Sequence, residues 1–341
     1  MKRILEVQKQ LVPDLLDVMK KRYTILHHIM ISGVIGRRTL AVSLNITERV
    51  LRGEVDFLKS QGLLEIESNG MRITPAGQLL LDQIEPMIKE VFELTDLESQ
   101  IRTTYGLSQV IIVPGDSDRS FFTKKELGRT AATILRKLVT NGDVVSVTGG
   151  STIAEVANHM SSSAPIKEAW FVPARGGLGE SVELQANTVA SQMAQRIGGQ
   201  YRLLHVPDDL GEEAYQSLLQ EPSVKEIVSF VRNCRIVVHG IGDAMVMAKR
   251  RKVGEATISM LQNVGAEAEA FGYYFDNNGH VVHKMMTLGL QLEDIQETEV
   301  VIGVAGGQSK GKAIAAFLKF GHEDILVTDE AAALEIIKYA P

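Results

Sequence analysis

Residues 37–55 read RRTLAVSLNITERVLRGEV, and this stretch decides the fold of the first part of the chain. Apolar residues recur at helical spacing on both sides of Asn45, which predicts two helices joined by a tight turn. Thr47 can cap the second helix, because its hydroxyl can accept a hydrogen bond from a first-turn N–H. Ala41 is small enough for the two helices to cross closely. The predicted inner face consists of Leu40, Leu44, Ile46, Leu51 and Val55.

A further helix and a hairpin flank this stretch. Pro13–Ile31 has apolar residues three and four apart, as an amphipathic helix requires. Leu63–Ile66 and Met71–Ile73 alternate around Asn69-Gly70, a strong hairpin signal because both residues tolerate a positive φ. Three helices followed by a hairpin predict a winged helix-turn-helix at the N-terminus.

The basic face of the helix that follows Thr47 is the candidate DNA-reading surface. Arg49 and Arg52 share the side opposite the apolar face with Asp56. The first turns of a recognition helix meet base edges, and Arg is the commonest reader of guanine. A lone helix with arginines is more often a solvated surface, but here the helices, the turn and the hairpin follow in the order of a DNA-binding motif. The predicted DNA-binding residues are Arg37, Arg38, Thr47, Arg49 and Arg52, with Arg37 and Arg38 placed for phosphates.

The distribution of charge agrees with this placement. Residues 1–80 hold 12 Lys and Arg against 8 Asp and Glu, a net charge of +4, whereas the whole chain has a net charge of -6. A basic N-terminal segment on an acidic body suggests that the N-terminus makes any contact with a polyanion.

The composition is that of a globular, cytoplasmic protein. Its 341 residues are enough for two domains, and 45% of them are hydrophobic. No apolar run approaches the ~18 residues of a membrane span, and Met1–Gln10 does not resemble a signal peptide. The single cysteine, Cys234, is predicted to be a buried residue in a reducing compartment. We therefore expect a cytoplasmic location and no membrane partner.

A long helix is predicted to connect two domains. Thr74-Pro75 opens it, because Pro is well tolerated at the first helical position, and it continues to about Thr104 with an interruption at Pro86. This helix could serve as a linker and dimer contact, or it could pack on its own domain. The predicted domains are a winged helix-turn-helix over 1–85, a helical linker over 86–106 and an effector-binding and oligomerisation domain over 107–341.

From Gln109 onward, short β-branched runs alternate with helical stretches. This alternation predicts βαβ units and a doubly wound, mostly parallel α/β domain. A hairpin around Asn277-Asn278-Gly279 departs from the scheme, and residues 254–268 show no clear pattern. The predicted strands are Val110–Val113, Val144–Thr148, Ala169–Val172, Arg202–Val206, Arg235–His239, Val300–Val304 and Ile325–Thr328.

Three Gly-rich turns each follow a strand and open a helix, at Val147–Ile153, His239–Asp243 and Val304–Lys310. Such turns direct free N–H groups to the positive end of a helix, which favours an anion. None has the Walker or the Rossmann glycine pattern, so a phosphate ligand other than a nucleotide is predicted. A fourth loop places Arg175 among glycines, where it could grip a phosphate.

A few residues would suit an enzyme rather than a binding protein. Glu269 could act as a base in a sugar-phosphate isomerase or deaminase, with Asp243 and His239 as further candidates. No nucleophile motif supports them, however, and His239 and His205 are predicted to be buried, hydrogen-bonded histidines. No cluster has the spacing of metal ligands. We expect a non-enzymatic protein with no cofactor and no metal.

Six segments carry a resemblance that is more specific than any of these turns. They are Ile35–Arg38, Glu48–Val55, Val113–Asp118, Phe171–Glu180, Phe271–Phe275 and Leu326–Glu330. Together they resemble the sorbitol-operon regulator family of sugar-responsive repressors, and the resemblance covers nearly the whole chain.

The resemblance implies a repressor of a glycolytic operon that binds operator DNA as a homo-oligomer, either a dimer or a tetramer. Its inducer would be fructose 1,6-bisphosphate, bound in a domain similar to sugar-phosphate isomerases and deaminases that has lost catalysis. The implied effector-binding residues are Gly149, Gly150, Ser151, Thr152, Arg175, Gln185, Arg250 or Arg251, Glu269 and Lys310.

Overall fold

The computed structural model describes residues 11–44, 46–177 and 181–341. Met1–Gln10, Asn45 and the end of the Arg175 loop, Leu178–Glu180, therefore lie outside the described residues. The chain divides into two compact units: residues up to Leu97 with Ser120–Phe122, and Glu98–Arg119 with the remainder from Thr123 onward. Across the described ranges, no helix is both long and apolar enough to cross a membrane.

The N-terminal unit contains the three predicted helices, α2 (Pro13–Ser32), α3 (Arg37–Ser43) and α4 (Glu48–Ser60). Thr47 caps α4, since its hydroxyl accepts a hydrogen bond from the N–H of Val50 at 3.3 Å. The predicted inner face is confirmed. Leu40, Leu51 and Val55 are fully buried, and Leu44 and Ile46 pack partly buried against the same core.

The hairpin is also present, formed by β1 (Leu64–Glu67) and β2 (Gly70–Ile73) in antiparallel register. Gly70 has φ 142°, and a Cβ there would lie 2.8 Å from the carbonyl oxygen of Ile35. This close approach allows Ile35 to pair with Met71, which ties the hairpin to the segment before α3. The unit therefore has the predicted winged helix-turn-helix fold.

The helix after the hairpin does not break where predicted. α5 (Pro75–Val91) continues through residue 86, and the interruption falls at Phe92–Glu93, before α6 (Leu94–Tyr105). Glu93 takes a left-handed φ of 61°, which an α-helix cannot contain. Leu81 and Ile88 of α5 are buried in the core of the N-terminal unit. The apolar face of this helix thus packs on its own domain, the second of the two alternatives.

The C-terminal unit is built on a parallel sheet of seven strands in the order β3-β13-β12-β7-β4-β5-β6. The chain winds outward from β4 to β6 and in the opposite direction from β7 to β13, so the order reverses between β4 and β7. This is a doubly wound sheet with its switch point at the β4–β7 pair. The strands are β3 (Gln109–Val113), β4 (Val144–Val147), β5 (Trp170–Pro173), β6 (Gln200–Tyr201), β7 (Ile236–His239), β12 (Val300–Val304) and β13 (Ile325–Asp329).

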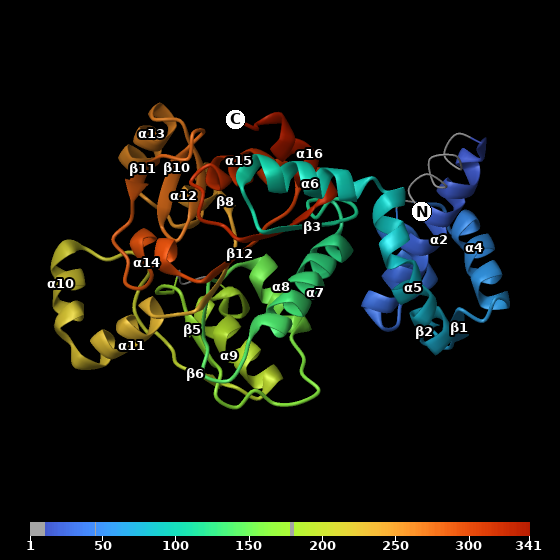
Figure 1. Cartoon of the computed structure of the whole chain (residues 1–341), viewed down its shortest axis with the longest axis horizontal. Coiled ribbons are helices and arrows are strands. Elements are labelled where there is room, and N and C mark those ends of the chain that lie inside the picture. The colour runs from blue at the N-terminus through green and yellow to red at the C-terminus, as the bar shows by residue number, and fades with distance from the viewer. Residues whose placement is uncertain (1–10, 45, 178–180) are drawn as a thin grey trace. The chain divides into compact units, whose positions relative to one another are not determined.

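Helices cover both faces of this sheet (Figure 1). α7, α8 and α9 share one core with alternate strand residues such as Val145, Val147 and Val238, whereas α15 and α16 lie on the other side. The alternation follows from the pleat, which directs successive side chains to opposite faces. The helices of this unit are α7 (Phe121–Leu138), α8 (Ser151–His159), α9 (Ala186–Ile197), α10 (Glu212–Gln220), α11 (Pro222–Arg232), α12 (Ala244–Arg250), α13 (Glu255–Asn263), α14 (Leu292–Glu297), α15 (Gly311–Leu318) and α16 (Glu330–Lys338).

A small antiparallel sheet, β11-β10-β9-β8, accompanies the main sheet. The predicted hairpin forms β10 and β11, and residues 254–268, which showed no clear pattern, form α13 and most of β9. The strands are β8 (Gly242–Asp243), β9 (Ala266–Ala270), β10 (Tyr273–Asp276) and β11 (Val281–Lys284).

Two predictions for the segment Arg202–Val206 are wrong. The strand at that sheet edge is β6 at Gln200–Tyr201, and residues 202–206 are irregular. His205 is exposed rather than buried, because side chains alternate in this segment and Leu204 and Val206 are the ones that face inward. Cys234 is buried as predicted, and burial raises the pKa of its thiol to about 12.

Candidate functional site

The candidate DNA-reading surface lies on the outer side of α4. Arg49, Arg52 and Asp56 are exposed there, whereas Leu51 and Val55 face the core. At the start of α3, Arg38 is exposed and Arg37 is half-buried. The five predicted DNA-binding residues thus lie on the two helices of the helix-turn-helix, Thr47 as the cap of α4.

An ion-pair cluster fixes α4 on α2. Glu54 accepts hydrogen bonds from Arg22 at 2.8 Å and pairs with Lys21 at 2.6 Å. Burial by itself raises the pKa of Glu54, but the hydrogen bonds from Arg22 and Lys21 outweigh it and lower that pKa. The Arg22 guanidinium also stacks over the Phe57 ring at 3.7 Å. The inner edge of α4 is therefore held by charge as well as by apolar packing, which leaves its arginine face for a ligand.

A cavity of about 320 Å³ opens in the C-terminal unit at the switch point of the sheet. Its floor comes from the segments that follow β4 and β7, tied together by a hydrogen bond from the Gly240 N–H to the Thr148 hydroxyl at 3.2 Å. Ligands of doubly wound sheets bind at this place. The structure brings all ten implied effector-binding residues to this one cavity: Gly149, Gly150, Ser151, Thr152, Arg175, Gln185, Arg250, Arg251, Glu269 and Lys310.

The turn at Gly149–Thr152 has the features of an anion site. Gly150 takes φ 109°, and a Cβ at Gly149 would lie 2.4 Å from the carbonyl oxygen of Leu184, so both positions favour glycine. The N–H groups of Ser151 and Thr152, at the start of α8, have no acceptor among the residues that the structure describes. Unpaired N–H groups at a helix N-terminus attract a negative charge.

The other two Gly-rich turns do not offer such a cradle, which corrects the prediction of three equivalent anion turns. The N–H groups of Gly307 and Ser309 already donate to the carboxylates of Asp329 at 2.7 Å and Asp118 at 2.8 Å. In the middle turn, Asp243 caps α12 through the N–H of Val246 at 2.8 Å. Carboxylates of the protein thus occupy N–H groups in or directly after both turns, and the turns line the cavity with Gly240–Asp243 and with Ser309 and Lys310.

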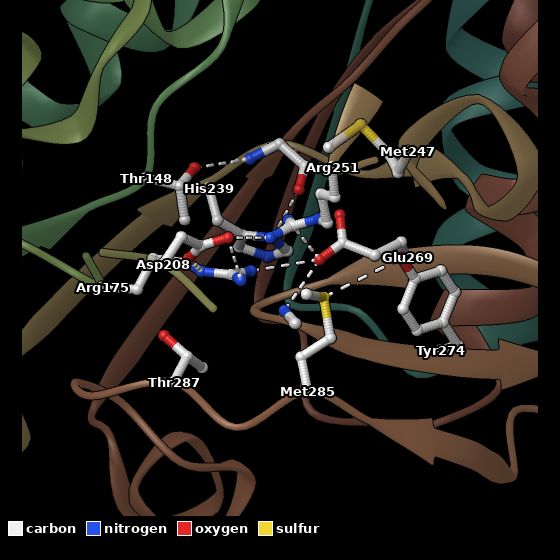
Figure 2. Close-up of polar contacts among 12 residues, drawn as sticks. Thr148, Arg175, Asp208, His239, Met247, Arg251, Glu269, Tyr274, Met285 and Thr287 are labelled. Atoms are coloured by element: carbon white, nitrogen blue, oxygen red, sulfur yellow. Dashed lines mark hydrogen bonds and ion pairs between the residues drawn. The ribbon is translucent and has the colours of Figure 1, made fainter. Parts of the chain in front are cut away.

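Four buried charges form a closed cluster beside the cavity (Figure 2). Arg175 donates to both oxygens of Asp208 and, at 3.2 Å, to Glu269; Arg251 also donates to Asp208 and, at 2.7 Å, to Glu269. The Gly272 N–H adds a bond to Glu269 at 2.7 Å. Two arginines and two carboxylates cancel in net charge, so Arg175 and Arg251 are engaged by the protein rather than presented as bare phosphate ligands.

The cluster determines the protonation of Glu269. Burial alone would raise its pKa, but the charges of Arg251 and Arg175 and the Gly272 N–H hold the pKa below its ordinary value. A carboxylate with a lowered pKa is a weak base, so it can accept hydrogen bonds from a ligand but is poorly suited to take up a proton.

Asp208 is a member of this cluster that sequence reasoning missed. It lies in the irregular segment after β6 and is 3% exposed, yet it accepts from both arginines. The sequence held no signal for it, since a lone Asp between a Pro and another Asp is typical of a surface turn.

Lys310 brings a positive charge to the lining of the cavity. Its ammonium makes no hydrogen bond or ion pair with the described residues. Burial lowers the pKa of Lys310, and the nearby charges of Lys124 and Arg250 lower it further. A half-buried cation beside other cations and a free helix N-terminus is arranged to receive an anion.

His239 does not take part in the cavity. It is fully buried, as predicted, and its Nε2 atom lies 2.5 Å from Glu323 while its Nδ1 atom lies 3.1 Å from the Gly240 carbonyl. Of the three candidate bases, His239 lies outside the lining residues, Asp243 caps a helix and Glu269 is a weak base, so none of them is suited to accept a proton from a ligand.

Comparison with known proteins assigns a domain type to each part of the chain. Residues 18–88 match the CggR N-terminal DNA binding domain, and residues 89–338 match the family described as "Putative sugar-binding domain". The central glycolytic genes regulator of Priestia megaterium is 50% identical over 339 residues, which cover 99% of this chain and 99% of that protein. This chain belongs to the SorC family of sugar-binding transcriptional regulators.

A second curated relative and a solved structure are also similar to this SorC-family regulator. The central glycolytic genes regulator of Bacillus subtilis is 47% identical over 338 residues, covering 99% of each chain. A solved SorC-family regulator from Enterococcus faecalis is 43% identical, with a TM-score of 0.67, and covers 71% of this chain and 99% of its own. These relatives are transcriptional regulators and not enzymes, as expected.

Proposed function

We propose that this SorC-family regulator represses a glycolytic operon and that its effector is a phosphorylated sugar, fructose 1,6-bisphosphate. The observation that carries the ligand class is that the unpaired N–H groups of Ser151 and Thr152 and the ammonium of Lys310 lie at one cavity. The choice of operon follows from the names of the relatives at 50% and 47% identity. The choice of bisphosphate follows from the resemblance described above.

The rest of the cavity suits the sugar portion of such a ligand. Glu269 remains ionised and can accept hydrogen bonds from sugar hydroxyls, and the Gln185 amide can both donate and accept. Arg250, at the end of α12, adds a second cationic group for another phosphate. Arg175 and Arg251 then act chiefly by holding Glu269 in its charged state.

Ligand binding would act on DNA binding through a homo-oligomer, a dimer or a tetramer. An effector shifts such an equilibrium only if it binds one arrangement more tightly, typically with ~1–3 kcal/mol of coupling. Effector binding in the cavity then changes the affinity for the operator, and operator binding changes the affinity for the effector by the same factor.

Thermal melting of the purified full chain with a panel of ligands tests the ligand class. Fructose 1,6-bisphosphate should raise the melting temperature in a concentration-dependent way, because a ligand that binds only the folded state stabilises it. Fructose at the same concentration should leave the temperature unchanged, and inorganic phosphate should have a smaller effect. Equal responses to fructose and its bisphosphate would show that the Gly149–Thr152 turn does not hold a phosphate.

Arg52→Ala tests the DNA-reading surface. The side chain is exposed on α4 and Ala is a good helix former, so the fold should be retained while specific operator affinity falls by ~1–3 kcal/mol. Lys59→Ala, an exposed position in the last turn of the same helix, is the matched control and should change affinity much less. The measurement is a titration with operator DNA and with random DNA. A loss of equal size on both DNAs would show that Arg52 contacts only phosphates.

A further inference from the structure

Lys124 is a cation beside the Gly149–Thr152 turn that the predicted ligand set does not contain. It lies in the first turns of α7, is half-buried, and is not among the residues that line the cavity. Its ammonium lies 3.4 Å from the hydroxyl oxygen of Ser151, and it makes no ion pair with a carboxylate of the described chain. A half-buried lysine without an acid partner is costly unless it has another role.

The contact determines how the Ser151 hydroxyl is used. An ammonium group can only donate, so the oxygen of Ser151 is the acceptor in this pair. Its own hydrogen is then directed elsewhere, and Ser151 lines the cavity. Together with its unpaired N–H at the start of α8, Ser151 presents two donors to an anion in the turn.

Lys124 also contributes charge. It is close enough to Lys310 that its positive charge helps to lower the Lys310 pKa, after the larger effect of burial. The nearby Asp118 carboxylate, which attracts Lys310, is itself engaged by the Ser309 N–H at 2.8 Å. Two neighbouring ammonium groups repel one another, and an anion bound close to both would relieve that repulsion.

We propose that Lys124 is a positioning residue for the phosphate group, acting by orienting the Ser151 hydroxyl and by supplying a second ammonium charge to the turn. This inference rests on the proposed function, because it presupposes that a phosphorylated sugar occupies the cavity. It adds a requirement of its own: the turn distinguishes a phosphate dianion from a monoanion through its two lysines.

Isothermal titration of the full chain with fructose 1,6-bisphosphate tests this role, with Lys124→Met as the variant. Affinity should fall about 10-fold at pH 7.5, because a charge-assisted interaction is lost. Lys124→Arg should restore most of it, since the guanidinium keeps the charge and the donors. Lys137→Met removes one charge from the exposed far end of the same helix and should bind as the wild type does.

The pH dependence separates this role from a merely structural one. A phosphate ester has its second pKa near 6, so at pH 5.5 the ligand is mostly monoanionic and the deficit of Lys124→Met should shrink to a few-fold. A deficit of unchanged size at both pH values, or wild-type affinity in Lys124→Met, would overturn the inference and leave the proposed function standing. A wild-type chain that binds no sugar phosphate would instead overturn the proposed function, and this inference with it.

Discussion

Replacing Asp208 with alanine should lower the free energy of unfolding of the C-terminal unit by about 3–5 kcal/mol. The side chain is 3% exposed and accepts hydrogen bonds from both Arg175 and Arg251. Its removal would leave two buried guanidinium groups facing the single carboxylate of Glu269. An uncompensated buried charge is among the few changes that give such a large loss.

Denaturant unfolding monitored by circular dichroism measures this loss, and the chain provides a close control. Asp209→Ala removes a carboxylate from the next residue, which is exposed, and should change stability by no more than about 0.5 kcal/mol. If Asp208→Ala unfolds at the same denaturant concentration as Asp209→Ala, the four charges do not form the closed cluster described here.

Replacing Lys310 with methionine should weaken effector binding by about 2–3 kcal/mol, roughly 30- to 150-fold. The same change should leave the ligand-free protein as stable as the wild type or more so. Burial and the charges of Lys124 and Arg250 all disfavour the charged Lys310, and methionine removes that penalty. Opposite signs for binding and for stability are therefore expected, and calorimetry with thermal melting measures both.

The titration of Lys310 gives this prediction a pH dependence. Its pKa is lowered in the folded protein, so the charged form that binds a phosphate is lost as the pH rises through that lowered value, earlier than for an ordinary lysine. Affinity should consequently decline on the alkaline side, and Lys310→Arg should move the decline to higher pH because an arginine stays charged. If the affinities of the wild type and of Lys310→Arg declined over the same alkaline pH range, Lys310 would be ruled out as the phosphate partner.

Local patterns were enough to predict the N-terminal unit and most strands of the main sheet. The apolar spacing of 37–55, the Thr47 cap and the Asn69-Gly70 hairpin are signals that act within a few residues, and tertiary packing did not override them. β-Branched runs likewise marked six of the seven predicted strands. Pro86 was misleading because its neighbours continue the helix, whereas the left-handed Glu93 carried no sequence signal.

Ten of the residues that line the cavity could be predicted from the sequence, but their ion pairs could not. Resemblance supplied ten residues that the structure brings together, yet it could not show that Arg175 and Arg251 are held by Asp208 and Glu269. The partners are 33 and 94 residues from Arg175 in sequence, so only the fold places them side by side. Lys124 was missed for a similar reason, since it precedes the first Gly-rich turn by a whole helix and a strand.

In the proposed function, occupation of the C-terminal cavity by a phosphorylated sugar controls DNA binding by the N-terminal unit. The most direct test is a fluorescence anisotropy titration of a labelled operator fragment with the full chain, in the absence and presence of fructose 1,6-bisphosphate up to millimolar concentration. We expect specific binding that the bisphosphate weakens or reorganises, and we expect Lys310→Met to lose this response while it retains operator affinity. Superimposable binding curves with and without the bisphosphate would contradict the proposed function.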